Sequence, residues 1–260
     1  MAALDHVVIN TLRNMDAASE CFATLGFTLT PRGHHSLGSI NHLMMTRGAY
    51  LELVGVPEAG LQRQEVLDSP YGLNGLVLRS DDADATFARL TEAGLHALAP
   101  GAFSRPVTID GQTLDARFRT VRFPAEMFSG GRVYFCEHLT PELVWRAEWL
   151  KHPNGFRGID RFVIESPDAK ADAERYAAAV AGHPERCASG WRVRLAGAQI
   201  DIMDGAEPRF ATVDLVFESL EEIEHGASLV KDAVWQRQRS DKATLSLPAF
   251  DLKLTCRSIR

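Results

Sequence analysis

Two polar residues interrupt strand-like runs near the start of the chain. His6 precedes the apolar run Val7–Ile9, and Glu52 lies inside the segment YLEL at 50–53. A strand with a purely structural role carries Val or Ile at such positions. An imidazole and a carboxylate are groups that transfer protons or bind metals, so these two residues are the first indication of a site.

The elements around these residues follow a recurring order. Residues 4–57 predict a β-α-β-β-β unit, with a helix that has Asn14 as N-cap and ends at Gly26. The same order of strand, helix and further strands appears four times, which indicates an internal repeat. The second unit is predicted as strand 73–79, helix 81–93 and strands 95–98, 113–123 and 132–139. The third is predicted as strand 159–165, a helix closed by Gly182 and strands 191–196 and 199–203. The fourth is predicted as strand 212–218, a helix opened by a Ser219/Glu222 capping box and strands 242–247 and 252–257.

Pairing these units predicts an α+β protein with two domains. Residues 1–139 hold the first pair of modules and 159–260 the second. Residues 140–158 carry Trp145 and Trp149 and predict a segment that covers a domain, because free linkers seldom contain two tryptophans. The sequence HPNG at 152–155 is typical of a turn.

Composition limits the partners. The 260 residues are 45% hydrophobic and 24% charged, with a net charge of -6, which fits a globular protein and argues against nucleic acid as a partner. We find no apolar stretch long enough to span a membrane and no signal peptide, so we expect a cytoplasmic protein. The four cysteines form no CxxC pair. We expect a small-molecule partner, and a homodimer stays open.

Several motifs resemble the vicinal oxygen chelate superfamily. They are LDH at 4–6, GSINHLMM at 38–45, YLELVGVP at 50–57, GLVLRSDDADA at 75–85, and CEHLTPELVW at 136–145 followed by HPNG. The chain is most similar to glyoxalase-like proteins of the third glyoxalase type. The resemblance implies glyoxalase and extradiol dioxygenase-like modules that pair into two half-open barrels, commonly around a divalent metal. It does not fix the chemistry, since the superfamily includes lyases, epimerases, dioxygenases and resistance proteins.

On the concave faces that this resemblance implies, alternation directs His6 and Glu52 inward, and His138 shares a face with Cys136. His6, Glu52 and His138 are therefore the predicted metal ligands, for Zn, Ni, Mn or Fe, with Glu52 or His138 as the catalytic group and no organic cofactor. The second module departs from the family pattern, because the position matching His6 falls near Gly75 and Cys136 stands opposite Glu52. The competing interpretation is structural: a hydrogen-bonded core histidine, a carboxylate paired with an arginine, and Cys136 as a small buried hydrophobe.

Five further residues are candidates for substrate binding. They are His35, Asn41, Arg105, Arg119 and Trp145. Asn41 is favoured over its neighbour because alternation lets only one of the two face the cavity, and the arginines suit a carboxylate or phosphate. The alternatives are a solvated loop for His35, a solvated strand face for the arginines and an anchoring role for Trp145.

We therefore predict a metal-dependent lyase or isomerase acting on a small oxygenated substrate. The metal would bind two neighbouring oxygens, acidify the adjacent C–H and stabilise the enediolate. Glyoxalase I itself does not fit, since its four-ligand set is incomplete here. A ring-cleaving dioxygenase is disfavoured because the second half offers Arg161, Asp214, Asp201 and Cys256 in place of a His/Glu set. The alternative function is non-catalytic binding, by which the protein sequesters or senses a small molecule. The absence of GxSxG, GxxxxGK[ST], HExxH and GxGxxG leaves hydrolase and nucleotide readings without support.

Overall fold

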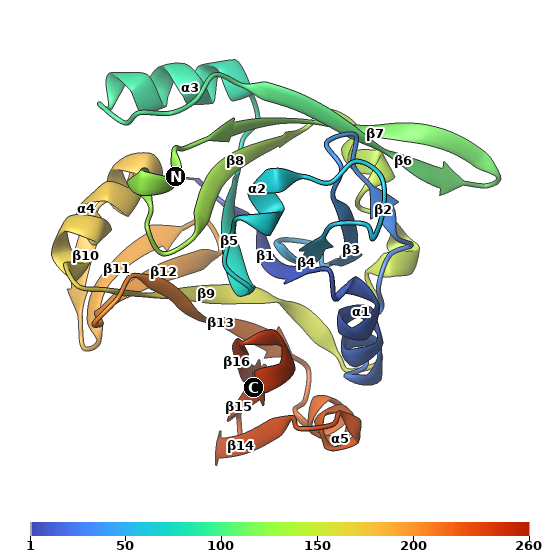
Figure 1. The fold of residues 1–260 in the computed structure, drawn as a ribbon. Helices are drawn as coiled ribbons and strands as arrows, with labels where there is room; N and C mark the ends of the chain where they lie inside the picture. Colours follow the sequence, from blue (N-terminus) through green and yellow to red (C-terminus); the bar gives the residue numbers. More distant parts are fainter. Residues whose placement is uncertain (1, 260) are drawn as a thin grey trace.

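The computed structural model describes residues 2–259 as two eight-stranded sheets with five α-helices (Figure 1). The first sheet comprises β1 (Leu4–Leu12), β2 (Gly33–His34), β3 (Ile40–Met44), β4 (Tyr50–Gly55), β5 (Gly72–Arg79), β6 (Gly101–Ile109), β7 (Gln112–Arg122) and β8 (Arg132–His138). The second comprises β9 (Phe156–Ser166), β10 (Pro184–Cys187), β11 (Gly190–Leu195), β12 (Ala198–Asp204), β13 (Arg209–Phe217), β14 (Val234–Arg239), β15 (Lys242–Leu247) and β16 (Leu252–Ser258). The helices are α1 (Met15–Thr24), α2 (Gln64–Leu67), α3 (Ala83–Glu92), α4 (Ala169–Ala179) and α5 (Glu221–Leu229).

Each sheet joins two modules at its centre. The first runs β2-β3-β4-β1-β5-β8-β7-β6 and the second runs β10-β11-β12-β9-β13-β16-β15-β14, so the two orders match strand for strand. In each module the first and last strands are parallel, and the two modules of a sheet meet through an antiparallel pair, β1 with β5 and β9 with β13. The predicted α+β fold of paired modules in two half-open barrels is confirmed. The boundaries at 139 and 159 stay a prediction.

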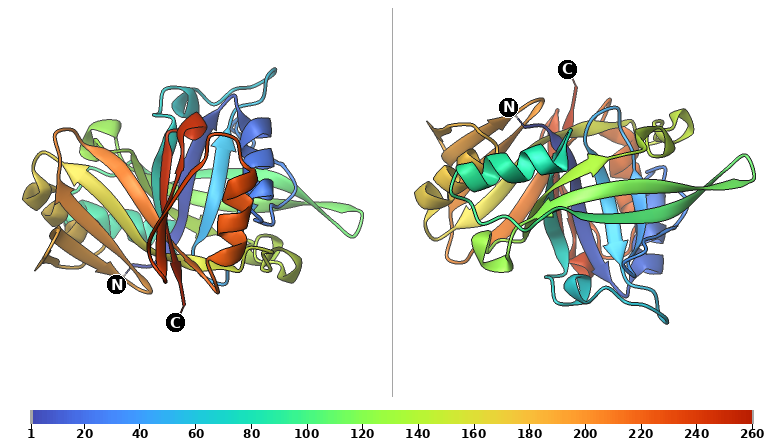
Figure 2. Two further views of the ribbon diagram at one scale, coloured as in Figure 1. Left: turned by 90° about the horizontal axis from the view of Figure 1, so that it is seen from below. Right: turned by 90° about the horizontal axis from the view of Figure 1, so that it is seen from above.

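One hydrophobic core joins the two halves. It contains side chains such as Ile9 and Leu53 from the first sheet, Phe162 and Leu215 from the second, and Phe22 from α1. The opposite face of the first sheet carries a second, smaller core that surrounds the candidate site. Figure 2 shows the long β6–β7 ribbon extending from the body of the molecule.

The segment between the sheets lies on that smaller core and contains two short 3-10 helices, η2 (Pro141–Leu143) and η3 (Ala147–Trp149). Two others lie elsewhere: η1 (Ala125–Met127) between β7 and β8, and η4 (Pro248–Phe250) between β15 and β16. Within the segment between the sheets, Leu143 and Val144 are buried. The following HPNG segment is fixed by hydrogen bonds from buried side chains. His152 Nε2 donates to the carbonyl of Met45 at 2.7 Å, and Asn154 Nδ2 donates to that of Leu25 at 2.9 Å. This turn therefore ties the segment to the first module.

Three strands differ from the sequence-based expectation. Residues 95–98 form no strand, since Leu95 N donates to Leu90 O and so prolongs the end of α3. The strand is β6 instead, where Pro106 is tolerated because β6 lies at the sheet edge. The strands β10 and β14 were not predicted; both are edge strands with mainly exposed polar side chains, which produce little apolar pattern.

Two predicted helix caps also differ. Asn14 occupies the N-cap position of α1, but its side chain donates to the Tyr71 hydroxyl and makes no cap bond. The helix α5 begins at Glu221 rather than directly after Ser219, whose hydroxyl accepts from Glu221 N, so no capping box with Glu222 forms. No helix within residues 2–259 is both long and apolar enough to cross a membrane.

Candidate functional site

A β-bulge in β1 builds the centre of the site. Leu4 pairs with Leu78 and His6 with Val77, so Asp5 is an extra residue between two successive pairs. An extra residue upsets the alternation of side chains between the two faces of a strand. Asp5 and its neighbour His6 consequently meet side by side, and Asp5 is completely buried. Sequence reasoning missed Asp5.

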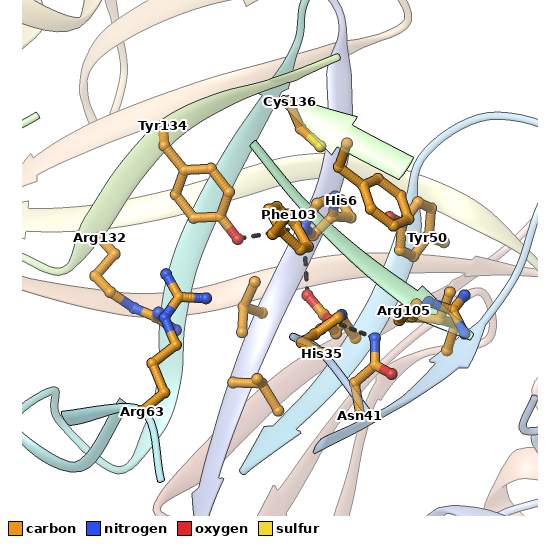
Figure 3. A pocket seen from close by; sticks show the side chains of 15 residues that line it. His6, His35, Asn41, Tyr50, Arg63, Phe103, Arg105, Arg132, Tyr134 and Cys136 are labelled. Atoms are coloured by element: carbon orange, nitrogen blue, oxygen red, sulfur yellow. Dashed lines mark hydrogen bonds and ion pairs between the residues drawn. The ribbon is translucent and has the colours of Figure 1, made fainter. Parts of the chain in front are cut away.

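His6 is held between two carboxylates. Its Nδ1 donates to Asp5 Oδ1 at 2.6 Å, and its Nε2 lies 3.3 Å from Glu52 Oε2. The ring stacks on Tyr50 with a centroid separation of 4.7 Å, and the Tyr134 hydroxyl lies 3.4 Å from Nε2. The imidazole therefore has a fixed orientation, with Nε2 towards Glu52. Figure 3 shows His6 with Tyr50 and Tyr134 among the residues that line the cavity.

These contacts determine the charges. Burial lowers the pKa of His6, but the hydrogen bonds and charges of Asp5 and Glu52 outweigh it and raise that pKa to about 9. Burial raises the pKa of Glu52, but the hydrogen bond and charge of His6, with smaller contributions from His35 and Asn41, lower it to about 2. Burial also opposes ionisation of Asp5, yet His138 and His6 hold its pKa well below the usual range. At neutral pH the group is an imidazolium between two carboxylates.

Asn41 fixes the other oxygen of Glu52. Its Nδ2 donates to Glu52 Oε1 at 2.7 Å, and its side chain is buried. The neighbouring His42 points away, with Nδ1 at 2.8 Å from the carbonyl of Thr30. The side chains of Asn41 and His42 thus lie on opposite faces of β3, as the expected strand alternation requires, and Asn41 is the one that faces the cavity.

The concave face holds a small cavity of about 40 Å³ beside this group. One water molecule needs roughly 10–15 Å³ of such a cavity, so there is room for about three waters or for one very small ligand. Ionisable, aromatic and apolar side chains share its wall: His6, Val8, His35, Asn41, Leu43, Tyr50, Glu52, Val54, Arg63, Phe103, Arg105, Phe118, Arg132, Tyr134 and Cys136. Beside the cavity the loop after β2 contacts β6, where Ser36 N donates to Ser104 O at 2.8 Å.

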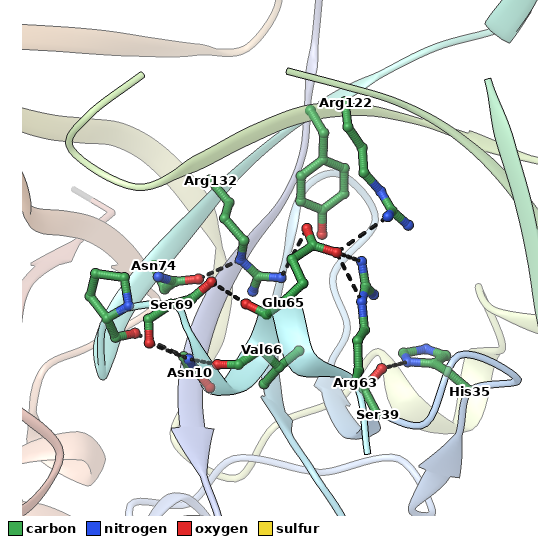
Figure 4. A network of polar contacts seen from close by, with 12 residues as sticks. Asn10, His35, Ser39, Arg63, Glu65, Val66, Ser69, Asn74, Arg122 and Arg132 are labelled. Carbon is green, nitrogen blue, oxygen red and sulfur yellow. Dashed lines mark hydrogen bonds and ion pairs between the residues drawn. The ribbon is translucent and has the colours of Figure 1, made fainter. Parts of the chain in front are cut away.

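A polar network borders the cavity on the side of α2 (Figure 4). Glu65 accepts from Arg63, and its carboxylate lies 3.2 Å from Arg122 Nη1 and 3.9 Å from Arg132 Nη1. Arg132 Nε also donates to Asn74 at 2.6 Å. The positive charges of Arg63 and Arg132 are therefore already paired within the protein.

The comparisons with known proteins agree with this geometry. A family model described as the glyoxalase-like domain matches residues 4–180, more than half of the chain. The chain belongs to this family. No curated protein matches it at a significant level.

Solved structures show the same fold at low sequence identity. A hypothetical protein from Staphylococcus aureus matches with a TM-score of 0.70 and 12% identity over 100% of both chains. A mutant of 4-hydroxymandelate synthase from Streptomyces coelicolor matches with a TM-score of 0.57 and 16% identity, covering 99% of this chain and 93% of the other. A xylose isomerase-like TIM barrel/4-hydroxyphenylpyruvate dioxygenase fusion protein matches with a TM-score of 0.62 and 11% identity, over 100% of this chain and 50% of the fusion protein.

In this glyoxalase-like chain the predicted metal triad does not converge. His138 Nε2 donates to Asp5 Oδ1 at 3.0 Å, so His138 lies beyond Asp5, on the Nδ1 side of His6, whereas Glu52 lies on the Nε2 side. Across residues 2–259, the group whose ligand atoms all approach within 4.8 Å is Asp5, Cys136 and His138. The oxygen, sulfur and nitrogen donors of this group suit a borderline transition metal. The buried Nδ1 of His138 has no hydrogen-bond partner, so it is available as a ligand atom.

The remaining candidates divide between the cavity and its surroundings. His35 lines the cavity, where burial lowers its pKa to about 4, and its Nδ1 lies 2.8 Å from Ser39 Oγ. Arg119 pairs with Asp84 at 2.7 Å and faces α3, so this geometry gives no support for its contact with a ligand. Trp145 packs on His138 at 4.7 Å and on Tyr50 at 5.7 Å, and so anchors the covering segment outside the cavity wall. Arg105 lines the cavity and is buried.

Register supports one equivalence drawn from the sequence and corrects two others. Asp5 in β1 and Asn74 in β5 are the bulged residues of the two strands, so LDHVVI at 4–9 aligns with LNGLVL at 73–78, and Gly75 corresponds to His6 as predicted. Because Val8 pairs with Glu52 and Val77 pairs with Tyr134, the residue that corresponds to Glu52 is Tyr134 rather than Cys136. In the second sheet, Cys256 is buried in the shared core and Arg257 takes the position that corresponds to Cys136.

The second barrel carries ion pairs where the first carries the site. Arg161 corresponds to His6 and bridges Asp201 at 3.3 Å and Asp214 at 2.8 Å. Asp160 is the bulged residue that corresponds to Asp5, and it pairs with Arg257. Segments LDHVV at 4–8 and IDRFV at 159–163 thus align, and this repeat is the signal that could have identified Asp5. No histidine occupies these positions of the second barrel.

Proposed function

We propose that this glyoxalase-like protein is a lyase or isomerase that moves a proton at a carbon next to an oxygen-bearing carbon of a small substrate. The observation that carries the proposal is the buried His6–Glu52 pair at 3.3 Å, which lines a small cavity. A carboxylate base and an imidazolium acid are the two groups that an enolisation requires.

In the proposed isomerisation, Glu52 takes the proton from the hydroxyl-bearing carbon while His6 Nε2 gives its proton to the neighbouring carbonyl oxygen. Glu52 then returns its proton to the former carbonyl carbon while His6 takes back a proton from the hydroxyl of the first carbon, so both groups end in the protonation state in which they began. A substrate that enters between the two side chains separates them. Because His6 is a main cause of the low pKa of Glu52, that separation makes Glu52 a stronger base when the substrate is present. Asp5 keeps the imidazolium oriented and charged, which favours the enediolate-like charge on oxygen.

A divalent metal fits the family and has a candidate site. Asp5, Cys136 and His138 would hold it, and a bound metal supplies a Lewis acid for substrate oxygens. The donor set favours Zn or Fe, because a thiolate ligand disfavours harder ions. Without a metal, burial keeps the pKa of the Cys136 thiol well above its ordinary value, so metal binding requires proton release.

Non-catalytic binding is the second candidate. It is favoured by Gly75, which stands at the second-module position equivalent to His6 and offers no ligand atom. A binding protein needs the cavity but does not need the proton-transfer pair.

Exchange of a substrate C–H for deuterium separates the two functions. Small 2-oxoaldehydes, hydroxyaldehydes, 2-hydroxy acids and hydroxy-acid thioesters are incubated in D₂O with the purified protein, with and without Zn or Fe, and followed by NMR. We expect exchange that is lost in Glu52→Gln and in His6→Gln. A compound that binds but exchanges at the same rate with both variants would exclude the lyase or isomerase and favour the binding function.

A further inference from the structure

Arg105 is a buried cation without a partner. It lies on β6 with 3% of its surface exposed, and within residues 2–259 its guanidinium makes no hydrogen bond or ion pair. Its Nη2 is completely enclosed and unpartnered. The other two arginines of the cavity, Arg63 and Arg132, are both near Glu65. Burial of an unpaired charge is costly, so its retention favours a ligand over a structural role.

The nearest carboxylate does not satisfy Arg105. Both oxygens of Glu52 are already engaged, Oε1 by Asn41 at 2.7 Å and Oε2 beside His6 at 3.3 Å. Burial lowers the pKa of Arg105, and the charge of Glu52 opposes this only in part. The guanidinium donors are therefore available in the cavity that Arg105 lines.

An unpartnered acceptor lies next to these donors. Asn41 Nδ2 donates to Glu52, and only the amide nitrogen can donate to a carboxylate, so Oδ1 is the free atom. Asn41 Oδ1 is buried and has no partner. A Cβ placed on Gly33 would lie 2.2 Å from this oxygen and 3.0 Å from Arg105 Nη1, so the two groups border the same point of β2. Figure 3 shows Arg105 and Asn41 on one side of the cavity.

From this juxtaposition we infer that the cavity binds a small 2-hydroxy acid, whose carboxylate pairs with Arg105 and whose hydroxyl donates to Asn41 Oδ1. A planar guanidinium matches a carboxylate with two parallel hydrogen bonds. The cavity of about 40 Å³ restricts the acid to the size of glycolate or lactate. The inference rests on the proposed function in that it names the substrate class for the same cavity.

Calorimetric binding of lactate, propionate and lactamide tests this inference. Lactate should bind the wild type, while propionate should bind more weakly because it lacks the hydroxyl, and lactamide more weakly because it lacks the charge. Arg105→Gln should weaken lactate binding by roughly 30-fold or more, given the strength of charge-assisted hydrogen bonds. Asn41→Ala should bring lactate and propionate to equal affinity. The matched control is Arg194→Gln, which removes an arginine from an exposed pair with Glu185 on the second sheet.

Three outcomes would overturn the inference. One is equal binding of lactate and lactamide; another is unchanged lactate affinity in Arg105→Gln; the third is no binding of any of these acids to the wild type at millimolar concentration. The melting temperature gives an independent readout, since removal of an unpaired buried charge should leave it equal or higher. A marked fall in melting temperature would show that Arg105 stabilises the fold. Lactate binding without deuterium exchange would leave this inference intact and would refute only the proposed function.

Discussion

The charge state of His6 is the most direct test of the site. In the structure the imidazolium depends on two carboxylates, Asp5 at 2.6 Å and Glu52 at 3.3 Å. The substitution Glu52→Gln removes one of them and keeps the size of the side chain. We expect the pKa of His6 to fall towards its ordinary value without reaching it, because Asp5 remains.

The magnitude follows from the two contacts. The rise of the His6 pKa from 6.5 to about 9 corresponds to roughly 3 kcal/mol in favour of the charged form. Glu52 makes the longer contact, so its share is less than half, on the order of 1 kcal/mol, or about a five- to tenfold change in proton affinity. The matched control is Glu137→Gln, which removes a carboxylate that does not contact His6 and accepts from Ala83 N instead.

Titration of ¹⁵N-labelled protein by NMR measures this pKa from the shifts of the imidazole nitrogens. Stability gives a second measurement. Since the folded-state pKa is raised, the contribution of His6 to stability is complete below pH 6.5 and is lost as the pH rises through about 9. Denaturation between those pH values should show this loss in the wild type and a smaller one in Glu52→Gln. A wild-type His6 that titrates at its ordinary pKa, or a Glu52→Gln variant with an unchanged His6, would refute the reasoning.

Further predictions concern the metal group, the covering segment and the turn. Cys136→Ser should weaken binding of Zn or Co by at least tenfold, measured by competition with a chelator, and equal affinity would exclude the thiolate as a ligand. Trp145→Ala should destabilise the protein by about 2–3 kcal/mol in urea, because its ring packs on Tyr50 and His138, and an unchanged midpoint would contradict this anchoring role. Asn154→Ala should cost about 1–3 kcal/mol by the same measurement, because the carbonyl that it bonds stays buried; a neutral effect would contradict that reasoning.

The sequence predicted most of the repeat and part of the site. Periodicity and terminating glycines located the four modules because their core faces are strongly apolar. It placed His6, Glu52 and Asn41 correctly on inward faces, since in regular strands alternation decides the face. It failed at β6, β10 and β14, because edge strands bury little and Pro106 resembles loop sequence.

The tertiary structure decided which of these residues meet. Asp5 reaches the site through a bulge, and a bulge depends on how two strands pair rather than on the residues of one of them. It also separated His138 from Glu52 by placing Asp5 and the His6 ring between them. The isolation of Arg105 is a property of packing as well, since a partner is absent only once all neighbours are in place. The sequence by itself thus determined the modules and the types of reactive groups, and the pairing of strands determined their charges and partners.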